Sequence, residues 1–226
     1  MTDRLRLAWP DRAAFAQRTE PIRLLAVSDE PDPSLESAAT RRQLGEIEMI
    51  IGCGDLEPEY LRFVADAFGV PLRYVRGNHD VGAAWRHAET ELIPEPLSDG
   101  EVTREGELRL LGFSGSPRYS DRGLEVSAAQ MWLRAWLASW RARGAAPLLV
   151  VTHAPPRGAG DDQDLAHRGF VAFRWLAERL HPPLWLHGHT ALVRRGLDAR
   201  CAQLNGTLVY NCTGATLVEL FPPEAG

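Results

Sequence analysis

Short apolar runs alternate along the chain with longer segments of helical periodicity. The apolar runs are rich in Val, Ile and Leu, and most end at a polar residue or a glycine-containing turn, which is typical of buried strands. The predicted strands are Ile22–Ser28, Met49–Gly52, Leu72–Arg76, Leu108–Phe113, Pro147–Thr152, Leu184–Leu186, Thr207–Asn211 and Thr216–Phe221. Strands that follow helices this regularly predict a layered α/β sandwich.

Four segments between these strands predict helices, covering residues 34–45, 58–69, 127–143 and 167–180. Pro58 suits the first turn of the second helix, and Gly69 suits its end. Ser127 and Gln130 have the spacing of a capping box at the start of the third.

The third helix carries a tryptophan stripe, and the chain begins with a segment of less regular pattern. Trp132, Trp136 and Trp140 recur every four positions, which predicts a side of the helix that faces the core rather than a platform for stacking bases. Residues 1–20 predict an additional helix or a loose arm. No linker or repeat divides the chain, so residues 1–226 are expected to form a single domain.

Composition narrows the functions that this chain can have. It is 45% hydrophobic and 24% charged, which indicates a globular rather than a disordered protein. All 25 basic residues are arginine, which excludes Schiff-base chemistry and the lysine-containing phosphate-binding loop. The net charge of -5 makes long nucleic acid an unexpected partner. Three sparse cysteines and the absence of a signal sequence or membrane span predict a cytoplasmic protein without membrane contact.

Five predicted strands end in residue types that bind metal ions. These residues are Asp29, Asp55, the run Asn78-His79-Asp80, His153, and His187 with His189. Ligands of α/β sheets gather at the carboxyl ends of strands, so we expect these side chains to converge. Carboxylate, amide and imidazole groups together predict a divalent cation, with Mn favoured and Fe, Zn, Ni or Co also compatible.

The same residues lie in short blocks: SDE (28–30), GD (54–55), GNHD (77–80), THAPP (152–156) and GHT (188–190). In this order and spacing the chain resembles the calcineurin-like metallophosphoesterases from about residue 22 to 190. GSPRY (115–119) and DLAHRGF (164–170) resemble a bacterial subgroup of that family. The resemblance implies a four-layer α/β/β/α sandwich, with two mixed sheets packed face to face and flanking helices. It also implies metal-dependent hydrolysis of a phosphate mono- or diester, for which we expect a small, nucleotide-like substrate.

The resemblance further implies a role for each metal-binding residue. Asp55 would bridge two metal positions. Asn78, His153 and His189 would complete the second position, and Asp29 would serve the first.

The resemblance also implies how the reaction proceeds. Metal-activated water would attack phosphorus, and His79 would protonate the departing oxygen while Asp80 orients its imidazole. Asn78 and His79 would face the substrate. Arg168, next to His167, is a further candidate for the substrate phosphate, because arginine makes bidentate contacts with phosphate oxygens.

Two positions depart from the family pattern, and both belong to the first metal position. Pro31 stands where the first block of the family has histidine, and Ala191 stands where the last block has its second histidine. One explanation is an enzyme that holds one tight metal and a second, weakly bound one through Asp29, Asp55 and waters. Alternatively, the protein is a regulatory module that binds metal and phosphate with little or no turnover.

A third explanation is that nearby residues replace the missing ligands. His187 lies two positions before His189, so on a strand both would point to the same face. Glu30 or Asp32 could supply a carboxylate. The intact His79 and Asp80 favour the two explanations that retain catalysis.

Overall fold

The computed structural model describes residues 2–86, 92–120, 122–144, 146–192 and 200–223. One of its two large sheets has the strand order β1-β13-β2-β3-β4. These strands are β1 (Asp3–Ala8), β13 (Gly214–Phe221), β2 (Ile22–Ser28), β3 (Met49–Gly52) and β4 (Leu72–Tyr74). The sheet is mixed, because β13 pairs antiparallel with β2 while the other neighbours are parallel.

The second large sheet has the strand order β11-β12-β10-β9-β6-β5 and is also mixed. Its strands are β11 (Cys201–Leu204), β12 (Thr207–Asn211), β10 (Leu184–His187), β9 (Leu148–Thr152), β6 (Leu108–Phe113) and β5 (Val102–Glu105). A separate short ribbon pairs β7 (Ser116–Pro117) with β8 (Glu125–Val126).

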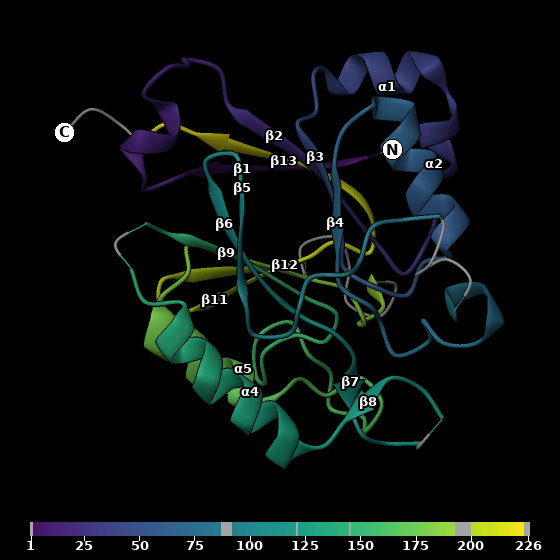
Figure 1. Cartoon of the computed structure of the whole chain (residues 1–226), viewed down its shortest axis with the longest axis vertical. Helices are drawn as coiled ribbons and strands as arrows, with labels where there is room; N and C mark the ends of the chain where they lie inside the picture. Colours follow the sequence, from purple (N-terminus) through teal and green to yellow (C-terminus); the bar gives the residue numbers. More distant parts are fainter. Residues whose placement is uncertain (1, 87–91, 121, 145, 193–199, 224–226) are drawn as a thin grey trace.

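Helices cover the outer faces of the two sheets, which pack against each other in the middle (Figure 1). Helices α1 (Ala38–Leu44) and α2 (Pro58–Phe68) cover the first sheet, and α4 (Ala128–Arg141) and α5 (Val171–Leu180) cover the second. The described elements also include two 3-10 helices, Arg12–Phe15 and Pro33–Glu36. The predicted α/β/β/α sandwich is confirmed.

The central strands are apolar on both faces because each face is covered. On β2, Leu24 and Ala26 lie in the core between the sheets, whereas Leu25 and Val27 pack in the core beneath α1 and α2. This alternation explains why the strand is a continuous apolar run in the sequence. On β9, Val151 faces the other sheet in the same way.

The first part of the chain, predicted as an additional helix or a loose arm, contains a strand followed by one short 3-10 helix, Arg12–Phe15. Residues 3–8 form the edge strand β1, which pairs in parallel with β13 near the other end of the chain. Arg4 and Arg6 of this strand lie 3.7 and 3.0 Å from the Glu219 carboxylate of β13. The prediction failed because β1 depends on a partner about two hundred positions away.

The tryptophan stripe does not face the core. Trp132, Trp136 and Trp140 are 39%, 49% and 52% exposed. The face of α4 that packs on the sheet instead carries small residues and one methionine: Met131, Ala135, Ala138 and Ser139. The apolar surface of α4 is wider than the area that the sheet and α5 cover, so periodicity predicted the wrong face.

None of the described helices is both long and apolar enough to cross a bilayer.

Candidate metal centre

Three side-chain atoms, from loops that follow three different strands, converge around the Nε2 atom of His153. That nitrogen lies 3.0 Å from Asn78 Oδ1, 3.3 Å from Asp55 Oδ2 and 3.1 Å from His189 Nδ1. Asp55 follows β3, Asn78 follows β4, His153 follows β9 and His189 follows β10. The carboxyl ends of strands from both sheets therefore meet here, as the sequence predicted.

Backbone carbonyls determine which nitrogen of each histidine carries its proton. His153 Nδ1 lies 2.9 Å from the carbonyl oxygen of Cys53, and His189 Nε2 lies 2.7 Å from that of Ala166. A carbonyl can only accept, so these nitrogens are the protonated ones in the neutral rings. The opposite nitrogens, His153 Nε2 and His189 Nδ1, then present lone pairs to each other.

The amide of Asn78 is oriented in the same sense. Its Nδ2 donates to the Tyr119 hydroxyl at 3.2 Å, which turns Oδ1 toward His153. The centre thus brings together four acceptor groups: the Asn78 amide oxygen, one ring nitrogen each of His153 and His189, and the Asp55 carboxylate. These groups repel one another unless a cation lies between them. Two imidazoles, a carboxylate and an amide oxygen fit a divalent transition metal, and the carbonyl contacts are those that orient metal-binding histidines.

The electrostatics of the centre also favour a positive charge. Burial of the His153 ring opposes protonation, but the carboxylates of Asp55 and Asp29 outweigh it and raise its pKa to about 9. Burial and the neighbouring His153 lower the pKa of His189 to about 3. Burial raises the pKa of Asp55, but His153 more than offsets this and the pKa is lowered. The centre therefore stabilises one positive charge, carried either by a proton on His153 or by a bound cation.

The backbone at the centre is in an uncommon conformation. Asp29, Asp55 and His189 have φ values of 59°, 56° and 69°, in the left-handed region that non-glycine residues rarely adopt. Such residues persist where the surrounding structure holds them, and they cluster at functional sites. Gly188 is needed beside them, because a Cβ there would overlap the Asp29 carboxylate.

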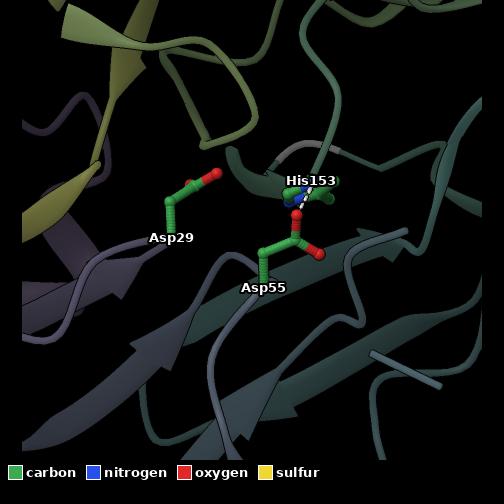
Figure 2. A group of neighbouring side chains, drawn as sticks. All are labelled: Asp29, Asp55 and His153. Atoms are coloured by element: carbon green, nitrogen blue, oxygen red, sulfur yellow. Dashed lines mark ion pairs between the residues drawn. The ribbon is translucent and has the colours of Figure 1, made fainter. Parts of the chain in front are cut away.

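Asp29 lies beside this set but its oxygens accept hydrogen bonds from the protein. Both are 3.0 Å from the backbone nitrogen of His189, and Ser28 Oγ donates to Oδ2 at 2.5 Å. Donor atoms of Asp29, Asp55 and His153 all lie within 4.8 Å of one another (Figure 2). Asp29 thus fixes the loop that carries His189 and also leaves a carboxylate close to Asp55.

The first metal position has few other donors among the described residues. Pro31 is exposed, and Ala191 lines the pocket without a donor atom in its side chain. Asp32 caps the 3-10 helix that begins at Pro33, by accepting from the Ser34 backbone N–H. Glu30 is exposed at the pocket wall.

His187 does not join His189 at the centre. Its ring is buried, its Nδ1 lies 2.8 Å from the Gly188 carbonyl, and its Nε2 faces the backbone of Gly160. The expectation of a shared face failed because β10 ends at His187, and the left-handed conformation of His189 breaks the alternation of a strand. The structure therefore gives no support to His187 as a replacement ligand.

His79 and Asp80 are arranged differently from the expectation. The His79 side chain is 74% exposed, with Nε2 3.9 Å from Asp55 Oδ2. Asp80 Oδ2 accepts from the backbone nitrogens of Gly77 at 2.6 Å and Asp55 at 2.9 Å. Asp80 therefore holds together the two loops that carry Asp55 and Asn78, rather than orienting the His79 ring. Burial raises its pKa to about 7.

A pocket of about 280 Å³ opens above the centre. Its walls are formed by Asp29, Glu30, Asp55, Asn78, His79, Tyr119, Ala166, His167, His189, Thr190, Ala191 and Thr213. Arg168 is not among them: it is exposed, and its Nε donates to the Gln163 carbonyl at 3.2 Å. The structure thus does not support Arg168 as a phosphate contact. Tyr119 lines the pocket but was not predicted as a site residue. It is the last residue of the GSPRY block, and the resemblance of that block to a bacterial subgroup of the family was the signal that could have identified it.

Comparison with known protein families agrees with this geometry. The family model described as calcineurin-like phosphoesterase matches residues 43–192. The chain belongs to this family. The calcineurin-like match includes Asp55, Asn78, His153 and His189, whereas Asp29 and Pro31 precede it. Members of the family are generally metal-dependent phosphoester hydrolases, and some are not catalytic.

Two solved structures resemble this family member. TT1561 of Thermus thermophilus is 16% identical, with a TM-score of 0.59 over 86% of this chain and 90% of that one. A single mutant of Vps29 from Entamoeba histolytica is 13% identical, with a TM-score of 0.37 over 85% of this chain and 74% of that one. The first likeness supports the fold. No curated protein matches the sequence.

Proposed function

We propose that the protein is a phosphoesterase that works with one tightly held divalent cation. The convergence of four lone pairs from Asp55, Asn78, His153 and His189, with both histidine tautomers set by backbone carbonyls, carries this proposal. A divalent cation bound there supplies Lewis acidity to water and to a phosphoryl oxygen. The donor set suits Mn, and it also admits Fe, Zn, Ni or Co.

The residues around the cation would perform the remaining steps. His79 lines the pocket with an exposed ring close to Asp55, so it can reach a bound ester and protonate the departing oxygen. Asp80 would act as a positioning residue, because its carboxylate ties the Asp55 loop to the Asn78 loop. Asp29 and Asp55 would offer a second cation only two carboxylates, so that cation would bind weakly.

The pocket supports a small substrate. Its volume of about 280 Å³ is near the lower end for pockets that bind small molecules, and the net charge of -5 disfavours long nucleic acid. Both a phosphate monoester and a diester are compatible with this space.

The rival function is a regulatory module that binds metal and phosphate without turnover. The loss of both first-position histidines, at Pro31 and Ala191, favours this alternative. The intact His79 at the pocket wall favours the enzyme, because a binding module has no need of a proton donor there.

Hydrolysis of bis-p-nitrophenyl phosphate by metal-stripped protein, before and after Mn²⁺ is restored, tests the proposal. We expect turnover to return with Mn²⁺ and to fall by more than about 100-fold in Asn78→Ala. The reason is that loss of a metal ligand should reduce activity more than loss of a group that only hydrogen-bonds to a ligand. Gln203→Ala, which removes an exposed amide on β11, is the matched control and should keep full activity. Circular dichroism establishes that each variant is folded.

Absence of turnover in folded wild-type protein, over several metals and pH values, would overturn the enzyme and favour the binding module. p-Nitrophenyl phosphate in a parallel assay distinguishes a monoesterase from a diesterase.

A further inference from the structure

A second hollow, of about 420 Å³, lies beside the metal pocket and is lined mainly by apolar side chains. It lies where the β7–β8 ribbon meets the first turns of α4 and α5. Its lining residues include Pro117, Arg118, Trp132, Phe170 and Val171. We call it the aromatic groove. Trp132 is 39% exposed and Val171 is 56% exposed, so these apolar surfaces face solvent in the described structure.

The aromatic groove and the metal pocket are lined by neighbouring residues of the same two segments. Arg118 lines the groove, and the next residue, Tyr119, lines the pocket and contacts the metal ligand Asn78. On the other side, His167 lines the pocket and Gly169 lines the groove. Residues one or two positions apart in each segment thus line the two spaces, which places their openings near each other.

The walls of the aromatic groove are fixed by the surrounding structure. The Trp132 ring packs against Trp175 of α5, with ring centroids 5.5 Å apart. The start of α4 is held by the reciprocal capping box of Ser127 and Gln130. A rigid apolar wall loses little conformational freedom when a ligand binds.

We propose that the aromatic groove binds the organic part of the phosphoester, and that this part carries a flat, uncharged aromatic ring. The inference rests on the proposed function, which places the phosphoryl group in the metal pocket. An indole face and a neighbouring guanidinium, those of Trp132 and Arg118, both stack favourably on flat rings. A flexible acyl chain would gain less, because ordering its many rotors costs conformational entropy. A nucleobase and an aryl group share the required chemistry.

The test uses phosphonates, which cannot be hydrolysed at the carbon–phosphorus bond, and measures equilibrium binding to the Mn²⁺-loaded protein by calorimetry. The probes are methylphosphonate, hexylphosphonate, (1-naphthylmethyl)phosphonate and the 5′-methylenephosphonate analogue of adenosine. We expect at least one aromatic probe to bind about tenfold more tightly than methyl- and hexylphosphonate. Whichever of the naphthyl and adenosine probes binds more tightly identifies the source of the ring.

Variants assign this preference to the aromatic groove. Trp132→Ala should reduce the affinity ratio of the better aromatic probe to methylphosphonate by about tenfold, and Trp132→Phe should restore most of it. Trp140→Ala removes another exposed tryptophan of α4, which does not line the groove, and it should leave the ratio unchanged.

Equal binding of methyl and aromatic probes, an equal or greater preference for hexylphosphonate, or an unchanged ratio in Trp132→Ala would each overturn the inference. Failure of the proposed function is distinguishable. It would appear as no hydrolysis of bis-p-nitrophenyl phosphate, whereas an aromatic preference that depends on Trp132 would still establish a ligand site in the groove.

Discussion

The two cation positions expected for this family differ here in what their donor atoms contact. At the position built from Asp55, Asn78, His153 and His189, lone pairs face one another across 3.0 to 3.3 Å around His153. At the other position, the Asp29 carboxylate is already engaged by N–H and O–H donors of the protein. Pro31 and Ala191 add no donor there.

The two positions therefore differ in how the surrounding protein orients their donor atoms. The position around His153 depends on backbone carbonyls of Cys53 and Ala166, which orient the histidines from outside the centre. At the position expected to be depleted, the Asp29 carboxylate accepts from the backbone N–H of His189. We propose that the main role of Asp29 is to position His189 for the tight cation.

The largest effect is expected from Asp55→Asn. The substitution removes the only negative charge among the four metal-binding groups. We therefore expect Mn²⁺ affinity to fall by more than about 100-fold, which exceeds the usual effect of removing a group that hydrogen-bonds to a ligand. Calorimetric titration with Mn²⁺ measures it. Asp66→Asn, at an exposed carboxylate of α2, is the matched control. Retention of tight Mn²⁺ binding by Asp55→Asn would place the cation elsewhere.

The next effect is a pH dependence of cation affinity. The pKa of His153 is raised to about 9, so below that pH the cation must displace a proton from this ring. Mn²⁺ affinity should therefore fall as pH falls, by up to about tenfold per unit, and level off above pH 9. Calorimetry in buffers of different ionisation enthalpy measures the proton release. A flat affinity across the neutral range would contradict this electrostatic description.

Asp29→Asn separates positioning from ligation. Asparagine keeps one acceptor but presents an amide group to the backbone N–H of His189, so that loop should be less well held. We expect Mn²⁺ affinity and turnover to fall together by about tenfold, as for other outer partners of metal ligands. Loss of turnover with unchanged affinity for the tight Mn²⁺ would instead show that Asp29 holds a second, essential cation.

The smallest effect is expected from Tyr119→Phe. The variant removes the hydroxyl that accepts from Asn78 Nδ2, but Tyr119 is 38% exposed and water can replace it. Mn²⁺ affinity should therefore fall by less than about tenfold. Tyr60→Phe, which removes a hydroxyl that accepts from the backbone of Asp32, is the control. An effect as large as that of Asp55→Asn would mean that the hydroxyl itself has a direct role.

The sequence predicted the layers and the convergence of the principal donors, since both follow from local patterns. Apolar runs mark β2, β3 and β9, and residues that end parallel strands meet at one edge of a sheet. The capping box at Ser127 and the helix end at Gly69 were likewise readable from adjacent residues.

The features that the sequence did not predict depend on tertiary context. His187 and His189 separate because of a single left-handed residue, which alternation cannot foresee. Trp132 is exposed because the sheet covers only part of a broad apolar helix face. The Asp80 carboxylate binds two backbone N–H groups that come together only when the loops after β3 and β4 have packed.

The most direct test of one retained cation position is titration of the metal-free protein with Mn²⁺, followed by electron paramagnetic resonance. The account predicts a single tight Mn²⁺ per chain with the signal of an isolated ion, and any second ion should bind far more weakly. Two tightly bound Mn²⁺ ions with a spin-coupled signal would contradict it.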